Sequence, residues 1–121
     1  MEKFEQKEEK SLKDAAIEAL KFLGIDDTDA QAVLNKWRQQ EDKEIAETPE
    51  EDRVDAEIHS LIYEAEIYFE AGYPEKAIES LNEAQEDALN YKMFDLIPKI
   101  SDKIDEYKNS QSSSVGRARL S

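Results

Sequence analysis

Apolar residues recur at steps of three and four along most of this chain, the spacing that gives an α-helix one apolar face. In the first such segment Leu12, Ala16 and Leu20 are followed by Gly24, and glycine commonly ends helices. Equivalent segments follow along the chain. Together they predict five helices, over residues 8–23, 28–44, 48–71, 74–90 and 93–108. A chain built from such segments is expected to be all-α.

Capping signals mark several of the helix termini. Thr28 stands three residues before a glutamine, which is the spacing of a capping box at the start of the second helix. Thr48 is a suitable N-cap for the third helix, and Pro49 fits its first helical position. Pro98 would cost about 3 kcal/mol in a helix interior but removes no hydrogen bond in a first turn. The fifth helix is therefore expected to begin near Phe94.

Length and composition limit the class of protein. With 121 residues the chain has room for one domain, predicted over residues 1–108. Residues 109–121 have no apolar periodicity and include three consecutive serines, so they are predicted to be a disordered tail. The absence of cysteine excludes disulfides and cysteine-ligated metal sites. No apolar run approaches the roughly 18 residues of a membrane-spanning helix, and no signal peptide is recognisable, so we expect a cytoplasmic protein with no membrane partner.

Negative charge is concentrated in the middle of the chain. The formal net charge is −14, and residues 41–89 hold 17 acidic and three basic side chains. This balance disfavours direct binding of nucleic acid and favours a protein or peptide partner with basic residues. A predicted acidic surface on the outer face of the fourth helix contains Glu79, Glu83, Glu86 and Asp87. It either keeps the protein soluble, docks a basic partner, or imitates a nucleic-acid backbone and occupies a DNA-binding protein.

Small and large residues follow a specific pattern between residues 58 and 91. Ala65, Ala77 and Ala84 stand where two antiparallel helices would approach closely, and Gly72 with Tyr73 ends the first of them. This framework resembles a tetratricopeptide repeat, a helical hairpin of about 34 residues. Other alanine-rich helical hairpins share much of the pattern. Only one repeat is evident, so the helices on either side of the hairpin, taken as residues 48–91, are expected to act as divergent caps.

Two arrangements of the five helices satisfy this interpretation. One is a right-handed helical array like that of tetratricopeptide proteins, in which the helix at residues 93–108 caps one side of the hairpin. The other is a compact antiparallel bundle in which the first helix folds back across the hairpin.

The resemblance implies a partner-binding groove lined by the first helix of the hairpin. Projected onto this chain, the groove would contain His59, Ile62, Tyr63, Glu66, Phe69 and Glu70. It lacks the lysines and asparagines with which some members of the family hold a partner's terminal carboxylate. Its apolar and aromatic residues with acidic edges favour a helix or extended peptide that carries Lys or Arg around an apolar residue. Alternatively, Ile62 and Phe69 belong to the core and contact the second helix.

Patterns typical of catalysis or metal binding are not recognisable. His59 is the sole histidine and has no neighbours at the spacing of a catalytic triad, while Glu66 and Glu70 would need ligands from another helix to hold a metal. We therefore predict a non-enzymatic protein-interaction module without a cofactor. The alternatives are an acidic inhibitor that sequesters a nucleic-acid-binding protein and a homo-oligomeric structural bundle.

Overall fold

The computed structural model describes residues 11–120, with side chains described as far as Ser110. Within residues 11–120 it contains five α-helices, one short 3₁₀ helix and no strand, so the prediction of an all-α fold is confirmed. The elements are α2 (Leu12–Leu23), α3 (Thr28–Glu47), α4 (Glu50–Ala71), α5 (Pro74–Asn90), η1 (Phe94–Leu96) and α6 (Ile97–Leu120). The first helix was expected from residue 8, and residues 8–10 lie outside the described part of the chain.

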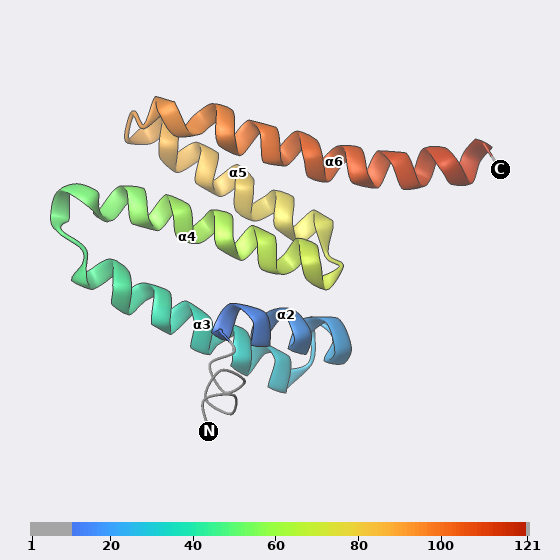
Figure 1. Cartoon of the computed structure of the whole chain (residues 1–121), viewed down its shortest axis with the longest axis horizontal. Coiled ribbons are helices and arrows are strands. Elements are labelled where there is room, and N and C mark those ends of the chain that lie inside the picture. The colour runs from blue at the N-terminus through green and yellow to red at the C-terminus, as the bar shows by residue number, and fades with distance from the viewer. Residues whose placement is uncertain (1–10, 121) are drawn as a thin grey trace, which may run out of the picture.

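The helices α3, α4, α5 and α6 lie side by side in chain order, and each runs antiparallel to the one before it (Figure 1). The most extensive contact in the molecule is between α4 and α5, and α6 packs on α5. By contrast, α3 and α4 touch each other little, because α2 packs against both of them. The first helix therefore covers part of α4 within an otherwise sequential array.

The hairpin of α4 and α5 is close-packed through its alanines. Ala65, Ala77 and Ala84 have no exposed surface, and Leu81 is equally buried beside them. Side chains of this size allow two helix axes to approach closely. Gly72 separates the helices with φ 101° and ψ 19°, a left-handed conformation that glycine adopts without steric cost. Pro74 then begins α5 at once.

One hydrophobic core runs through the array. Each helix contributes fully buried side chains, which include Leu20 of α2, Leu34 of α3, Ile58 of α4, Leu81 of α5 and Ile100 of α6. Removing a large buried aliphatic side chain from such a core typically costs about 2–5 kcal/mol. The core thus fixes the relative positions of all five helices.

Two predicted helix caps are wrong. The N-cap of α3 is Asp27 rather than Thr28: the Asp27 side chain accepts hydrogen bonds from the backbone N–H groups two and three residues later, at 2.9 and 3.1 Å. Thr48 caps the end of α3, since its hydroxyl donates to the carbonyl oxygen of Glu44 at 2.7 Å. Pro49 therefore stands at the N-cap of α4, where no side chain caps the helix.

The C-terminal segment also departs from expectation. The chain forms η1 at Phe94 and continues into α6 with Pro98 in its first turn. In the structure α6 extends to Leu120, beyond the end expected at residue 108, and the disordered tail stays a prediction. Once a helix is nucleated, each further residue adds one hydrogen bond, and no proline follows Pro98 to stop it. Polar composition alone does not reveal this continuation.

The outer face of α6 is polar over the residues whose side chains are described. Ile100, Ile104 and Tyr107 are buried against the array. The exposed positions include the charged residues Lys99, Asp102, Asp105, Glu106 and Lys108. The array therefore ends in a charged helix surface on the α6 side.

Candidate functional site

Two residues of the predicted groove are not available to a partner. Ile62 is 1% exposed and belongs to the core. Phe69 is half-buried and stacks on Tyr107 of α6, with the ring centroids 3.9 Å apart. The predicted open groove is corrected at both positions, because the core buries Ile62 and Tyr107 of the C-terminal helix stacks on Phe69. The helix that covers Phe69 is α6 rather than the second helix of the chain.

Glu66 is also occupied within the protein. Its carboxylate lies between two lysines: Lys13 Nζ of α2 is 2.5 Å from Oε1, and Lys103 Nζ of α6 is 3.1 Å from Oε2. Burial opposes ionisation of Glu66, but the hydrogen bonds from the two lysines outweigh it and hold the carboxyl pKa below its ordinary value. Glu66 thus links three helices. Glu70, one turn further along α4, is exposed.

The remaining predicted residues, His59 and Tyr63, line a cleft between α3 and α4. Because α2 begins at Leu12, it occupies only the part of the space between these helices that lies next to the first half of α3. Two hollows between these helices extend from Ser11 toward the turn at Thr48, which joins α3 to α4 at the left of Figure 1. We call this space the α3–α4 cleft.

The α3–α4 cleft consists of two adjoining hollows. The first, of about 480 Å³, is lined by Ser11, Leu12, Lys13, Trp37, Gln40, Glu41, Glu44 and Tyr63. The second, of about 390 Å³, is lined by Glu41, Glu44, Ile45, Thr48, Asp55, Ala56, His59 and Tyr63. The two hollows share Glu41, Glu44 and Tyr63, so they form one continuous space. Leu12, Trp37 and Tyr63 are the apolar residues that line its α2 end, and the far end adds Asp55 to the two shared glutamates.

Tyr63 is the most accessible large apolar group of the cleft, with 42% of its surface exposed. The ammonium group of Lys13 lies 5.2 Å from the centre of its ring. His59, one turn earlier on α4, donates from Nδ1 to the Asp55 carbonyl oxygen at 2.9 Å, and the same nitrogen lies 3.4 Å from the Asp55 carboxylate. These contacts hold an aromatic pair beside the acidic end of the cleft.

Glu41 occupies the centre of the cleft and is half-buried. Burial is the main reason that the pKa of its carboxyl lies above its ordinary value. The negative charges of Glu44 and Asp42 raise the pKa further, while a hydrogen bond from Ser60 and the charge of Lys13 lower it. An added cation in the cleft would therefore stabilise ionised Glu41.

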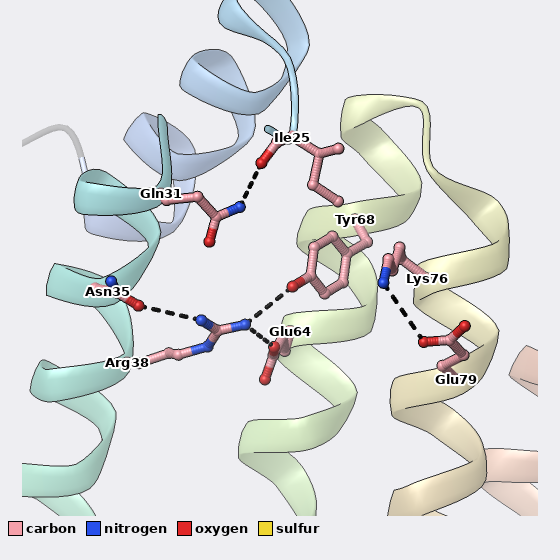
Figure 2. A network of polar contacts seen from close by, with 8 residues as sticks. All are labelled: Ile25, Gln31, Asn35, Arg38, Glu64, Tyr68, Lys76 and Glu79. Atoms are coloured by element: carbon pink, nitrogen blue, oxygen red, sulfur yellow. Dashed lines mark hydrogen bonds and ion pairs between the residues drawn. The ribbon is translucent and has the colours of Figure 1, made fainter. Parts of the chain in front are cut away.

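Arg38 of α3 links α3 to α4 through hydrogen bonds to two side chains of α4. Figure 2 shows its guanidinium reaching from α3 to Glu64 and Tyr68 of α4; the nitrogen-to-oxygen distances are 2.7 and 2.9 Å. On this opposite side of the two helices another hollow, of about 330 Å³, is also acidic and includes Asp87 of α5 in its lining. The Arg38 contacts hold α3 and α4 in register along the cleft.

The predicted acidic surface is divided in the structure. Glu83 and Glu86 are exposed on α5, and Glu79 is exposed with Lys76 at 3.9 Å (Figure 2). Asp87 is half-buried and faces the hollow beside Arg38 instead. The four acids therefore do not form one continuous surface.

Several residues of the site escape inference from the sequence. Glu41, Glu44 and Asp55 were recognised only as part of the acidic middle of the chain, and Lys13 was not singled out. Lys13 and Glu66 are 53 residues apart, so no local pattern connects them. The concentration of acids over residues 41–89 was the one signal that pointed to this region.

Within the described residues, no group of three or more His, Cys, Asp or Glu side chains is arranged to hold a metal ion. None of the described helices combines the length and apolar character needed to cross a membrane. Comparisons with protein-family models, with curated proteins and with solved structures give no match for this chain. The resemblance to tetratricopeptide repeats thus stays a prediction.

Proposed function

We propose that this protein is a non-enzymatic, cytoplasmic interaction module whose α3–α4 cleft binds a basic segment of a partner protein. The observation that carries the proposal is the cleft itself, in which the partly exposed ring of Tyr63 lies among the carboxylates of Glu41, Glu44 and Asp55. The two successive hairpins, α2 with α3 and α4 with α5, support a tetratricopeptide-like scaffold for this role.

The chemistry of the cleft favours a helix or peptide with one apolar residue flanked by Lys or Arg. An apolar side chain placed against the exposed part of the Tyr63 ring would leave water, which is the main source of binding energy in such a site. Basic side chains would meet the carboxylates at the other end and supply orientation and a faster association rate. The site therefore differs from the groove inferred from the family, since only His59 and Tyr63 belong to both.

An acidic inhibitor of a nucleic-acid-binding protein is the second candidate. The observation that favours it is the row of exposed acids Glu79, Glu83 and Glu86 on α5. Such a surface would bind through charge alone, so its affinity should fall steeply with added salt. A cleft that also buries an apolar residue should lose only part of its affinity. A homo-oligomeric bundle, the third candidate, would instead appear as a dimer or larger species in light scattering.

The test is a titration of the full chain against a labelled peptide of alanine and glutamine that carries one leucine flanked by lysines. Tyr63→Ala should weaken binding at least tenfold by fluorescence anisotropy, and Glu44→Lys should also weaken it. Tyr91→Ala is the matched control, because Tyr91 is an exposed tyrosine outside the cleft and should change nothing. If binding is unaffected by Tyr63→Ala but is lost when Glu83 and Glu86 are both replaced by lysine, the cleft proposal is wrong. The result would then favour the acidic inhibitor.

A further inference from the structure

The two ends of the α3–α4 cleft differ in charge. Glu41 and Glu44 line both hollows, and the hollow next to α2 adds Lys13 to them, whereas the hollow at the far end adds Asp55. Among the described residues that line the two hollows, Lys13 is the one lysine or arginine. The cleft is therefore most negative toward Thr48 and least negative beside α2.

Lys13 is held at the α2 end of the cleft by contacts with two side chains of α4. Its Nζ lies 2.5 Å from Oε1 of Glu66 and 5.2 Å from the centre of the Tyr63 ring. An ammonium group over an aromatic ring is attracted by the negative face of that ring. The exposed tyrosine of the cleft therefore already has a cation beside it, and this cation comes from α2.

Glu66 does not cancel the positive charge at this end of the cleft. The same carboxylate also pairs with Lys103 of α6 at 3.1 Å, so two ammonium groups share one carboxylate and one positive charge remains. The charge of Lys13 also acts inside the cleft, because it lowers the pKa of the Glu41 carboxyl. A second cation brought close to Lys13 would be repelled, and such like-charge contacts select against the wrong ligand.

The carboxylates at the far end of the cleft are open to a cation. Among residues 11–110, no lysine or arginine forms an ion pair with Glu44 or Asp55. Glu44 is exposed and accepts a hydrogen bond from the side-chain amide of Gln40 at 2.9 Å. The Asp55 side chain is 45% exposed and lies 3.4 Å from Nδ1 of His59. A lysine or arginine of a partner can therefore approach both carboxylates from solvent.

We propose that Lys13 makes the cleft selective for partner segments whose lysines or arginines all lie on one side of the apolar residue. With that apolar residue against Tyr63, the basic side chains lie toward Thr48, and the residues on the α2 side are uncharged. This inference rests on the proposed function, because it specifies the charge pattern of the partner for the same cleft. Lys13 acts as a specificity-determining residue that rejects basic side chains at the α2 end.

Three peptides of one composition test this selectivity. Each contains alanine, glutamine, one leucine and two lysines, and the lysines stand both before the leucine, both after it, or one on each side. The last of these is the leucine–lysine peptide described above. Charge alone does not fix the direction of the peptide backbone, so both one-sided orders are needed. The better one-sided peptide should bind the full chain about fivefold or more tightly than the two-sided peptide, measured by fluorescence anisotropy.

Substitutions of Lys13 assign the preference to this residue. Lys13→Gln removes the positive charge, so the two-sided peptide should bind more tightly and the preference should disappear. Lys13→Arg keeps the charge and should keep the preference. Lys21→Gln is the matched control, because Lys21 belongs to the same helix and lies over an aromatic ring, Phe22, outside the cleft. A gain in affinity for the two-sided peptide cannot result from partial unfolding, so the readout separates selectivity from stability.

The same measurements distinguish failure of this inference from failure of the proposed function. Equal binding of the three peptides to the unmodified chain would overturn the selectivity and leave the cleft as a docking site. A preference that survives Lys13→Gln would overturn the role of Lys13 with the same consequence. If none of the three peptides binds, the proposed function is wrong and this inference fails with it.

Discussion

Phe69 of α4 and Tyr107 of α6 stack face to face, with ring planes 6° from parallel. Phe69 is the residue on which a groove along α4 would depend, and in the structure it serves instead to hold α6 against the hairpin. Tyr107 is 3% exposed and Phe69 is half-buried, so the stacked faces of the pair are shielded from water. The part of α4 that stays available to a partner is therefore its middle, where His59 and Tyr63 line the α3–α4 cleft.

Replacement of Phe69 should therefore affect stability and leave peptide binding in the cleft unchanged. Phe69→Ala removes the stacking contact and leaves a gap beneath Tyr107, so we expect a loss of about 2–4 kcal/mol in the free energy of unfolding. Urea denaturation followed by circular dichroism measures the change. Phe94→Ala, at a phenylalanine 60% exposed, is the control and should cost less than about 0.5 kcal/mol. A Phe69→Ala protein of unchanged stability but weakened peptide binding would instead support the predicted partner-binding groove along α4.

The bridge from Glu66 to Lys13 and Lys103 predicts a dependence of stability on pH. Because the pKa of Glu66 is lowered in the fold, its contribution is complete above its ordinary pKa and is lost as the pH falls through the lowered value. Glu66→Gln should cost about 1–3 kcal/mol at pH 7, and the difference from the unmodified protein should shrink toward acid pH. Unfolding curves from pH 7 to pH 3 measure it. Glu70→Gln, at an exposed position, should show no such trend.

The close approach of α4 and α5 predicts intolerance of larger side chains. Ala77 has no exposed surface, so Ala77→Leu should overpack the contact and cost about 1–3 kcal/mol in the free energy of unfolding. Glu83→Leu introduces the same side chain at an exposed position of α5 and controls for helix propensity. If both variants have the same stability, the two helices are not in tight contact at Ala77.

Peptide binding in the cleft should weaken at acid pH through Glu41. The pKa of this carboxyl is raised by burial, and a bound lysine favours the ionised form, so protonation opposes binding. Affinity for the leucine–lysine peptide should start to fall at a higher pH than the ordinary glutamate pKa of 4.5. Glu41→Gln should weaken binding at pH 7 and delay the remaining loss to lower pH. Glu47→Gln, an exposed acid outside both hollows, should leave the pH profile unaltered.

The positions of the helices could be predicted from the sequence because their signals are local. Periodic apolar residues, Gly72 and Pro74 each act within one or two turns, and the bounds of α4 and α5 follow from them. The cap of α3 was misplaced by one residue because Asp27 and Thr28 are adjacent and both residue types can cap.

The site was less predictable because it depends on which faces of α3 and α4 are covered by α2, α5 and α6. The pattern that places Ile62 and Phe69 on one side of α4 does not reveal that the core and α6 bury that side. Lys13 meets Glu66 only after α2 has packed against α4. The cleft lies beside the part of α3 that α2 does not cover, since α2 is shorter than α3. Helix lengths alone do not predict this, because it depends on how the two helices pack.

The charged outer side of α6 limits the stacking of further helices on that end of the array. Over the part of α6 whose side chains are described, the outward residues Lys99, Asp102 and Glu106 offer no apolar surface to a further hairpin or to the first helix of a second copy. Growth into a filament by end-to-end stacking on this side is therefore disfavoured. On the proposed function, affinity for a partner would then come from the α3–α4 cleft of one chain rather than from repeated copies.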